Sequence, residues 1–249
     1  MAGKVKSILV SQPKPTDENS PYFALAKKYN LKIDFKNFIQ IEGVTVNEYR
    51  KQGLDPVKFS AIVLTSKNAV DHFFRIVREL KTEMPPDTKY FCVGETTALY
   101  LQKYIIVRKR KLYIGEKTTG DLIEIVKKHK TESFLYPCSD IHHTDLTDYM
   151  HQNGFNIKEA IIYHTIPSDL SEVKGAKYDL ICFFSPSGID SLFKNFPEFT
   201  QADTKVAVFG PTTAKAAIEN GLRVDIEAPL PNVPSLTGAI ELYLKNHNK

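Results

Sequence analysis

The sequence predicts an α/β protein built from two similar domains, each with a parallel β-sheet covered by helices. Two internal repeats support this prediction, and so does the alternation of strand-like and helix-like patterns along the chain. The first repeat consists of apolar runs that end at a serine and resume at helical spacing, at 62–66 and at 181–185. Each copy is typical of a buried strand, a tight turn and a helix.

The second repeat is a glycine turn followed by two threonines and an alanine. It occurs at 94–98 and again at 210–214. The glycine follows the serine of the first repeat by 28 residues in one copy and by 25 residues in the other. Two matches in the same order and at similar spacing indicate a duplicated fold.

The chain begins with a βαβ unit. A short apolar strand at 7–10 precedes a loop at 13–21 that is rich in Pro, Asp, Asn and Ser. Apolar residues between 22 and 29 then recur at helical spacing, and 31–35 alternates as a second strand. Because a helical crossover joins them, the two strands are expected to be parallel.

Strands and helices alternate through the rest of the chain, which is the pattern of parallel sheets between helices. Further strands are expected at 38–42, 61–64, 90–93, 105–107, 134–136, 157–163, 178–184, 205–209 and 224–226. Further helices are expected at 70–80, 97–104, 120–128, 146–152, 188–193, 213–219 and 235–244.

The strand count predicts how these elements divide into domains. The C-terminal set alone has about three strands, whereas sheets commonly have about four to six, and the N-terminal βαβ unit brings the number to about five. We therefore expect a discontinuous domain, 1–38 with 166–249, and an inserted domain, 39–165. The crossings near 38–42 and 163–167 would form a two-segment β hinge, with the active-site cleft between the domains.

Composition restricts the function classes. The chain has 249 residues, 42% hydrophobic and 25% charged, as in soluble globular proteins, and no apolar run approaches the roughly 20 residues of a membrane span. The apolar run at 8–10 is too short for a signal peptide, so we expect a cytoplasmic protein. We also expect a monomer. Net charge is +4, and the one dense basic run, 108–111, is expected to be solvated, which argues against nucleic acid as the partner.

Three widely separated cysteines, Cys92, Cys138 and Cys182, show no spacing typical of a metal site. Cys92 and Cys182 lie in strand-like runs and are expected to be buried structural thiols. Cys138 lies in the run 136–140 and could be catalytic, but without a marked basic neighbour an inert thiol is favoured. No nucleophile elbow, glycine-rich phosphate loop or zinc-hydrolase spacing appears.

Hydroxyl residues gather where helices are expected to begin: Ser66, Thr96, Thr97, Ser185, Ser187, Thr212 and Thr213. Each alone is best explained as a helix cap, because its oxygen accepts a free N–H of the first turn. Together they predict four helix N-termini, two from each domain, around one cleft. Such a cleft should bind a ligand with several anionic groups.

Two further candidates lie outside these turns. The pair His142–His143 is either an exposed surface pair or, if one ring faces the cleft, a carboxylate ligand or proton carrier. Tyr163 lies at the expected hinge. Its phenol either donates a hydrogen bond to a leaving hydroxyl or a carboxylate, or packs between the domains with its hydroxyl satisfied.

Taken together, these motifs resemble those of the uroporphyrinogen-III synthase family. The resemblance covers essentially the whole chain and rests on the motifs Leu64-Thr65-Ser66, Val93–Ala98, Leu135–Cys138, Tyr163-His164-Thr165, Phe184–Gly188 and Gly210–Ala214. It implies two α/β domains joined by a β-ladder. It also implies a cyclising hydro-lyase that closes hydroxymethylbilane, which carries eight carboxylates, into uroporphyrinogen III with inversion of ring D and loss of water, without metal or organic cofactor.

The resemblance further implies roles for individual residues. Elimination of the terminal hydroxyl would give an azafulvene, followed by a spiro intermediate and closure, with Tyr163 as donor to the departing hydroxyl. The implied substrate-binding residues are Ser66, Lys67, Thr96, Thr97, Cys138, Ser139, Ser185, Pro186, Ser187, Gly188, Thr212 and Thr213. Lys67-Asn68 stands where many members have a Pro-Arg-like pair, which weakens the case for a specific Lys67 contact.

Two rival functions fit parts of the same pattern. A non-enzymatic, hinged two-domain binding protein for a small polycarboxylate would have a similar hinge and cleft. An RNA or DNA binder would use the basic run at 108–111, and its affinity would fall steeply with salt. No output domain for ligand sensing is visible, so the enzyme is favoured.

Overall fold

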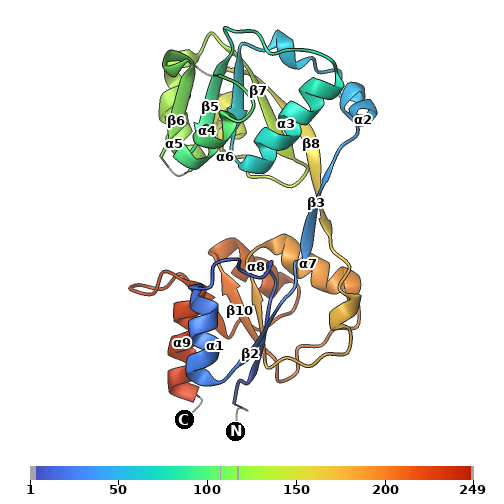
Figure 1. The fold of residues 1–249 in the computed structure, drawn as a ribbon, viewed down its shortest axis with the longest axis vertical. Helices are drawn as coiled ribbons and strands as arrows, with labels where there is room; N and C mark the ends of the chain where they lie inside the picture. The colour runs from blue at the N-terminus through green and yellow to red at the C-terminus, as the bar shows by residue number, and fades with distance from the viewer. Residues whose placement is uncertain (1–3, 107, 117, 248–249) are drawn as a thin grey trace. The chain divides into compact units, whose positions relative to one another are not determined.

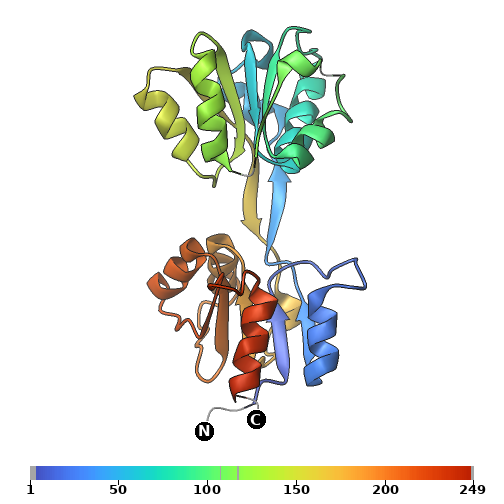
Figure 2. The same ribbon diagram turned by 90° about the vertical axis from the view of Figure 1, so that its left-hand side faces the viewer.

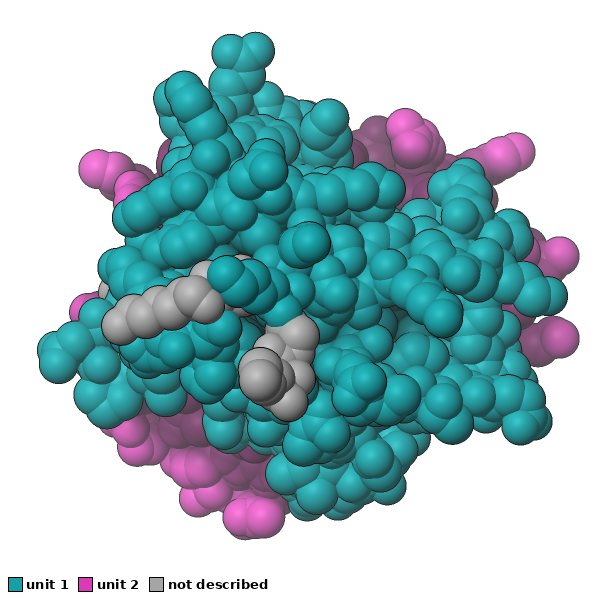
Figure 3. Space-filling model, turned by 90° about the horizontal axis from the view of Figure 1, so that it is seen from below, with its two compact units in different colours: residues 1–40, 166–249 teal, residues 41–165 magenta. Residues whose placement is uncertain are grey.

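The computed structural model describes residues 4–106, 108–116 and 118–247. The chain divides into two compact units (Figure 3). Unit 1 comprises Met1–Gln40 and Ile166–Lys249, and unit 2 comprises Ile41–Thr165. Strands β3 (Ile39–Gly43) and β8 (Asn156–Pro167), which lie side by side, lead the chain from one unit to the other and back (Figures 1 and 2).

Unit 1 is a five-stranded parallel sheet in the order β11-β10-β9-β1-β2. Its strands are β1 (Ser7–Val10), β2 (Lys32–Phe35), β9 (Leu180–Phe183), β10 (Lys205–Phe209) and β11 (Ile226–Ala228). Its helices are α1 (Pro21–Tyr29), α7 (Pro186–Asn195), α8 (Pro211–Glu219) and α9 (Leu236–His247). The N-terminal βαβ segment therefore completes a sheet that the C-terminal part of the chain leaves unfinished.

The side chains of strand β1 point alternately to the two faces of the sheet and contribute to a hydrophobic core on each face. Ile8 and Val10 pack with α1 and α9, which lie side by side in Figure 1, whereas Leu9 packs with α7 and α8 on the opposite face. Successive side chains of a strand point to opposite faces, so an apolar run buried on both sides fills both cores.

Asp179 ties β1 to β9, although the two strands are far apart in sequence. One of its carboxylate oxygens accepts hydrogen bonds from the amides of Lys6 and Ser7, both at 2.8 Å, and from the Ser7 hydroxyl at 2.9 Å. Burial alone would raise the pKa of Asp179, but these donors together hold that pKa below its ordinary value. The N-terminal segment is thus held in place by charge-assisted hydrogen bonds as well as by the sheet.

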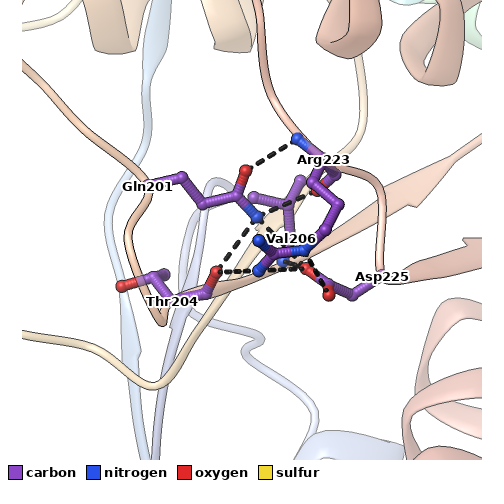
Figure 4. A network of polar contacts seen from close by, with 5 residues as sticks. All are labelled: Gln201, Thr204, Val206, Arg223 and Asp225. Carbon is purple, nitrogen blue, oxygen red and sulfur yellow. Dashed lines mark hydrogen bonds and ion pairs between the residues drawn. The ribbon is translucent and has the colours of Figure 1, made fainter.

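A second polar network closes the loops that precede β10 and β11 (Figure 4). The Gln201 side-chain amide donates to the carbonyl oxygens of Thr204 and Arg223, at 3.0 and 2.9 Å, and to Asp225 at 3.1 Å. Asp225 also accepts from the amide of Val206 at 3.0 Å and from the Arg223 guanidinium at 2.9 Å. These bonds lie at the amino ends of the strands, opposite the edge where the candidate site residues lie.

Unit 2 is a six-stranded sheet in the order β3-β8-β7-β4-β5-β6, with β4 to β8 parallel. Its remaining strands are β4 (Ala61–Leu64), β5 (Lys89–Val93), β6 (Leu112–Gly115) and β7 (Ser133–Ser139). Its helices are α2 (Val46–Lys51), α3 (Lys67–Glu79), α4 (Glu95–Leu101), α5 (Thr119–Val126) and α6 (Asp145–Gln152). Short 3₁₀ turns are Pro56–Lys58, Lys109–Lys111, Lys127–His129 and, in unit 1, Ser171–Val173.

The two units share one strand order. The strand order β11-β10-β9-β1-β2 of unit 1 corresponds, position by position, to the order β6-β5-β4-β7-β8 of unit 2. Ser66, which follows β4, is therefore equivalent to Ser185, which follows β9. Helices α3 and α4 pack on one face of the unit 2 sheet, as α7 and α8 do in unit 1. The predicted fold class, two similar α/β units with parallel sheets, is confirmed.

Two expected strands were misplaced. Ile105 and Ile106 are not in a strand, Ile106 is fully exposed, and Val107 lies outside the described residues. The strand that pairs with β5 is instead β6, where the Tyr113 ring stacks on Phe91 at 4.7 Å. Packing of this aromatic pair outweighs the β-branched run at 105–107. The last strand of unit 1 begins at Ile226, not at 224.

The basic run at 108–111 is largely solvated, as expected: Arg108, Lys109 and Arg110 are exposed, and Lys111 pairs with Asp87 at 2.7 Å. No helix in the described part of the chain is both long enough and apolar enough to cross a membrane.

Candidate functional site

In unit 2, the candidate site residues lie at the carboxyl ends of three neighbouring strands. Ser66 follows β4, Gly94 follows β5 and Ser139 ends β7. Because parallel strands end at the same edge of a sheet, these residues border one edge, where open α/β sheets bind ligands. Ser66 is the N-cap of α3, and its hydroxyl accepts the Ala69 amide at 3.1 Å.

Tyr163 on β8 belongs to the same edge. It is only 8% exposed, and its ring centroid lies 5.1 Å from that of His72. Burial raises the pKa of Tyr163, and a side-chain hydrogen bond with Ser66 opposes this rise. The phenol therefore keeps its proton at neutral pH, and that proton can be donated to another group.

A carboxylate-centred network fixes the end of β7 against β8. Asp140 accepts hydrogen bonds from the Ser139 hydroxyl at 2.9 Å and from the Thr165 amide at 3.0 Å, and His164 Nδ1 lies 3.0 Å from its other oxygen. Burial would raise the pKa of Asp140, but these partners hold it below the ordinary value. The Asp140 amide donates to the Tyr163 carbonyl at 3.3 Å, so the network also positions Tyr163.

The corresponding edge of unit 1 is built in the same way. Ser185 follows β9 and caps α7, and its hydroxyl accepts the Gly188 amide at 3.2 Å. Pro186 and Pro211 occupy the first positions of α7 and α8 and have no N–H group. The first free amides of the two helices are therefore those of Ser187 and Thr212, which have no acceptor within their own helices.

The expectation that all seven hydroxyl residues cap helices is wrong for five of them. Gly94 and Gly210 are the N-caps of α4 and α8, with φ of 76° and 89°, and neither helix has a side-chain cap bond. This backbone region is essentially restricted to glycine, which explains the glycine of the repeat. The five residues that lie inside the first helical turn are Thr96, Thr97, Ser187, Thr212 and Thr213.

Burial divides the threonines of the repeat in the same way in both units. Thr97 and Thr213 are buried, Thr213 being only 1% exposed, whereas Thr96 and Thr212 are exposed. A ligand at these edges can therefore reach the side chains of Thr96 and Thr212, but not those of Thr97 and Thr213.

Lys67 and Cys138 differ in accessibility. Lys67 is exposed on the first turn of α3, and its Nζ lies 5.5 Å from the centre of the Tyr100 ring. Cys138 is 2% exposed, and burial raises the pKa of its thiol to about 12. All three cysteines are free and buried, which confirms the expectation of buried thiols for Cys92 and Cys182. The role of Cys138 in substrate binding stays a prediction.

His142 does not belong to a surface pair. His143 is exposed, but His142 is largely buried, with Nδ1 2.7 Å from the Ser139 carbonyl oxygen and Nε2 3.4 Å from the Glu159 carboxylate. Cys138 lies in the same cluster, and the three ligand atoms are within 4.8 Å of one another. No sequence spacing predicts this cluster, because Glu159 comes from β8, the strand beside β7.

The fold and these edges define a class of protein: a duplicated α/β protein in which helix N-termini and hydroxyls border the carboxyl edge of each sheet. The sequence model described as Uroporphyrinogen-III synthase HemD matches residues 22–238. The chain therefore belongs to the uroporphyrinogen-III synthase family, and the resemblance found in its motifs is confirmed.

Individual relatives agree with this assignment. The uroporphyrinogen-III synthase of Saccharomyces cerevisiae is 23% identical over 253 aligned positions, which cover 90% of this chain and 87% of the yeast protein. The structure of uroporphyrinogen-III synthetase from Helicobacter pylori has a TM-score of 0.63 and 22% identity, covering 97% of this chain and all of that one. A mutant uroporphyrinogen III synthase from Thermus thermophilus gives a TM-score of 0.58 at 16% identity, covering 96% and 98%.

The structural likenesses support the fold, and the family match supports the function. Family membership makes the chain an enzyme of tetrapyrrole biosynthesis and favours this function over the hinged, non-enzymatic binding protein.

Proposed function

We propose that this protein is a cyclising hydro-lyase that converts hydroxymethylbilane into uroporphyrinogen III, with inversion of ring D and loss of water. The observation that carries the proposal is the match of the family over residues 22–238, which include the serine and glycine turns of both units. The carboxyl edges of the two sheets supply the chemistry that such a substrate requires.

The substrate carries eight carboxylates, and each edge offers groups that bind them. The amides of Ser187 and Thr212 have no intrahelical acceptor, and the positive ends of the α7 and α8 dipoles favour anions. Lys67 adds a cation at the start of α3. We propose that both edges bind the same substrate molecule, through backbone amides more than through side chains. The expected cleft between the domains stays a prediction.

Tyr163 is the proposed proton donor to the departing hydroxyl. Burial raises the pKa of its phenol, which therefore keeps a proton to donate at neutral pH. The Asp140 network holds the backbone of Tyr163 in place and is the proposed positioning device. Loss of water from the terminal carbon would then give the azafulvene.

Ring inversion requires control of geometry more than strong acid–base catalysis. The azafulvene reacts readily with a pyrrole, so the protein must hold the two ends of the chain in the arrangement that leads to the spiro intermediate. Fixed amides on rigid helix ends suit this task, because they impose geometry without moving. Neither a metal nor an organic cofactor has a role in the proposed steps.

The product isomer tests the proposal. Purified protein incubated with hydroxymethylbilane is expected to give uroporphyrinogen III in excess over isomer I, separated by chromatography after oxidation. An isomer ratio equal to that of the reaction without protein would refute the proposed activity.

We further propose that the protein acts in the cytoplasm as a monomer and without nucleic acid. The modest net charge of +4 and the single short basic run at 108–110 support the absence of a nucleic-acid partner. Size-exclusion chromatography with light scattering is expected to give the mass of one chain, and a dimer mass would contradict it.

A further inference from the structure

We propose that Cys138, His142 and Glu159 form a binding site for a thiophilic divalent cation such as Zn²⁺, beside the carboxyl edge of the unit 2 sheet. The three ligand atoms, a thiol sulfur, an imidazole nitrogen and a carboxylate oxygen, all lie within 4.8 Å of one another. This donor set is one that Zn²⁺ prefers, and three protein ligands leave a fourth position open.

The strand register explains why the three groups meet. Tyr136 lies opposite Glu159 and Cys138 lies opposite Ile161 in the parallel pair β7–β8. Residues two apart on a strand share a face, so Cys138 and Glu159 are diagonal neighbours on the same face of the sheet. The turn after β7 places His142 near these residues, and its ring packs edge-on against Tyr136 with the ring centroids 5.6 Å apart.

The hydrogen bond of His142 fixes which ring nitrogen faces the cluster. Nδ1 lies 2.7 Å from the Ser139 carbonyl oxygen, which can only accept, so Nδ1 carries a proton and donates. Nε2 is then the nitrogen that can coordinate a metal. Histidine ligands of metals commonly donate their other N–H to a backbone carbonyl in this way.

The Nε2 atom of His142 is fully buried and has no hydrogen-bond partner among the described residues. A carboxylate oxygen of Glu159 lies 3.4 Å away. Two lone-pair atoms at this separation repel each other unless a cation lies between them. A metal ion would supply that charge, and so would a proton on Nε2, which leaves a simple His142–Glu159 ion pair as the alternative.

Coordination at this site involves one proton transfer. The metal ion replaces the proton of the Cys138 thiol to form a metal–thiolate bond, and the released proton leaves to solvent. The bound ion would link β7, the turn after it and β8, and so stiffen the segment 138–142 next to Ser139 and Asp140. The proposed cyclisation requires no ion here, so the apo protein would retain the chemistry proposed above.

Cadmium and zinc binding test the site without reference to activity. Cd²⁺ added to the reduced apo protein is expected to produce the ultraviolet charge-transfer absorbance of a cadmium–thiolate bond, saturating at one ion per chain, and Zn²⁺ is expected to displace it. Zn²⁺ should also raise the melting temperature of the protein, and a chelator should reverse the rise.

Matched variants separate this site from adventitious binding. Cys138→Ser should abolish the absorbance, whereas Cys92→Ser, which alters a thiol equally buried on β5, should retain it. Glu159→Gln, at a partly exposed side chain, should fold normally and bind at least about tenfold more weakly. The proposal is overturned if Cd²⁺ gives no thiolate absorbance, an outcome that would leave only the ion pair. It is also overturned if Cys138→Ser retains the absorbance or if Glu159→Gln binds as tightly as the parent.

Discussion

The exchange Tyr163→Phe removes one hydroxyl from the carboxyl edge of unit 2 and changes little else. Tyr163 is 8% exposed, and its ring packs against His72, so phenylalanine can fill the same space. The structural loss is the hydrogen bond with Ser66, worth about 1 kcal/mol of unfolding free energy. The variant should therefore fold, with a modest decrease in stability.

The effect on turnover should be much larger than the effect on stability. If the phenol protonates the departing hydroxyl, its removal costs at least about 100-fold in kcat, because general-acid catalysis contributes roughly 10²–10⁴-fold. A 100-fold loss corresponds to about 2.7 kcal/mol of transition-state free energy. The spontaneous closure to isomer I then competes, so the fraction of isomer III should fall as well.

Tyr136→Phe is the matched control. Tyr136 is equally buried, lies on the neighbouring strand β7, and has a hydroxyl that is hydrogen-bonded to Thr65. Both variants are assayed by single-turnover kinetics and by chromatography of the product isomers. Unchanged kcat in Tyr163→Phe, or an equal loss in both variants, would refute the assignment of Tyr163 as proton donor.

Three further changes test other parts of the account. Asp179→Asn should lower the unfolding free energy by ~2 kcal/mol near neutral pH, because it weakens three charge-assisted bonds. The pKa of Asp179 is lower in the folded than in the unfolded protein, so its contribution to stability is complete above the unfolded pKa of ~3.9. The contribution is lost as the pH falls through the folded pKa. A stability difference in urea titrations that does not change with pH would contradict this. Gly210→Ala should lower the unfolding free energy by ~1–3 kcal/mol because φ of Gly210 is 89°. The control Gly120→Ala, within α5, should not destabilise the protein. Equal melting temperatures for the parent and Gly210→Ala would refute the proposed backbone strain. Ser185→Ala should lose ~1 kcal/mol with the cap of α7 and raise KM more than it lowers kcat; unchanged KM would remove the α7 turn from substrate binding.

The fold was predictable because local signals and packing agree. Apolar runs such as 61–64 and 180–183 are buried on both faces, and each ends at a serine that caps the next helix. The same pattern failed for the strand expected at 105–107: Ile105 and Ile106 have no sheet neighbour among the described residues, while the less apolar segment 112–115 pairs with β5. Pairing is a tertiary property, and one sequence window does not contain it.

The site was predictable where it depends on turns and not where it depends on contacts between strands. Ser66 and Ser185 were correctly predicted as caps, but the glycine caps Gly94 and Gly210 were missed, since a helix can also begin at a glycine whose φ is positive. Asp140 and Glu159 were missed for a different reason. Their partners lie on the neighbouring strand β8 or the turn after β7, so no sequence spacing records them.

The central physical claim is that the carboxyl edges of both sheets hold one tetrapyrrole through helix N-terminal amides. Amide hydrogen exchange with and without bound uroporphyrinogen III, resolved by residue, tests it directly. The account predicts slower exchange on binding at all four turns, 66–69, 94–97, 185–188 and 210–213, with no change at the start of α5. Protection confined to the turns of one unit, or equal protection at Thr119 and Gly120 of α5, would contradict it.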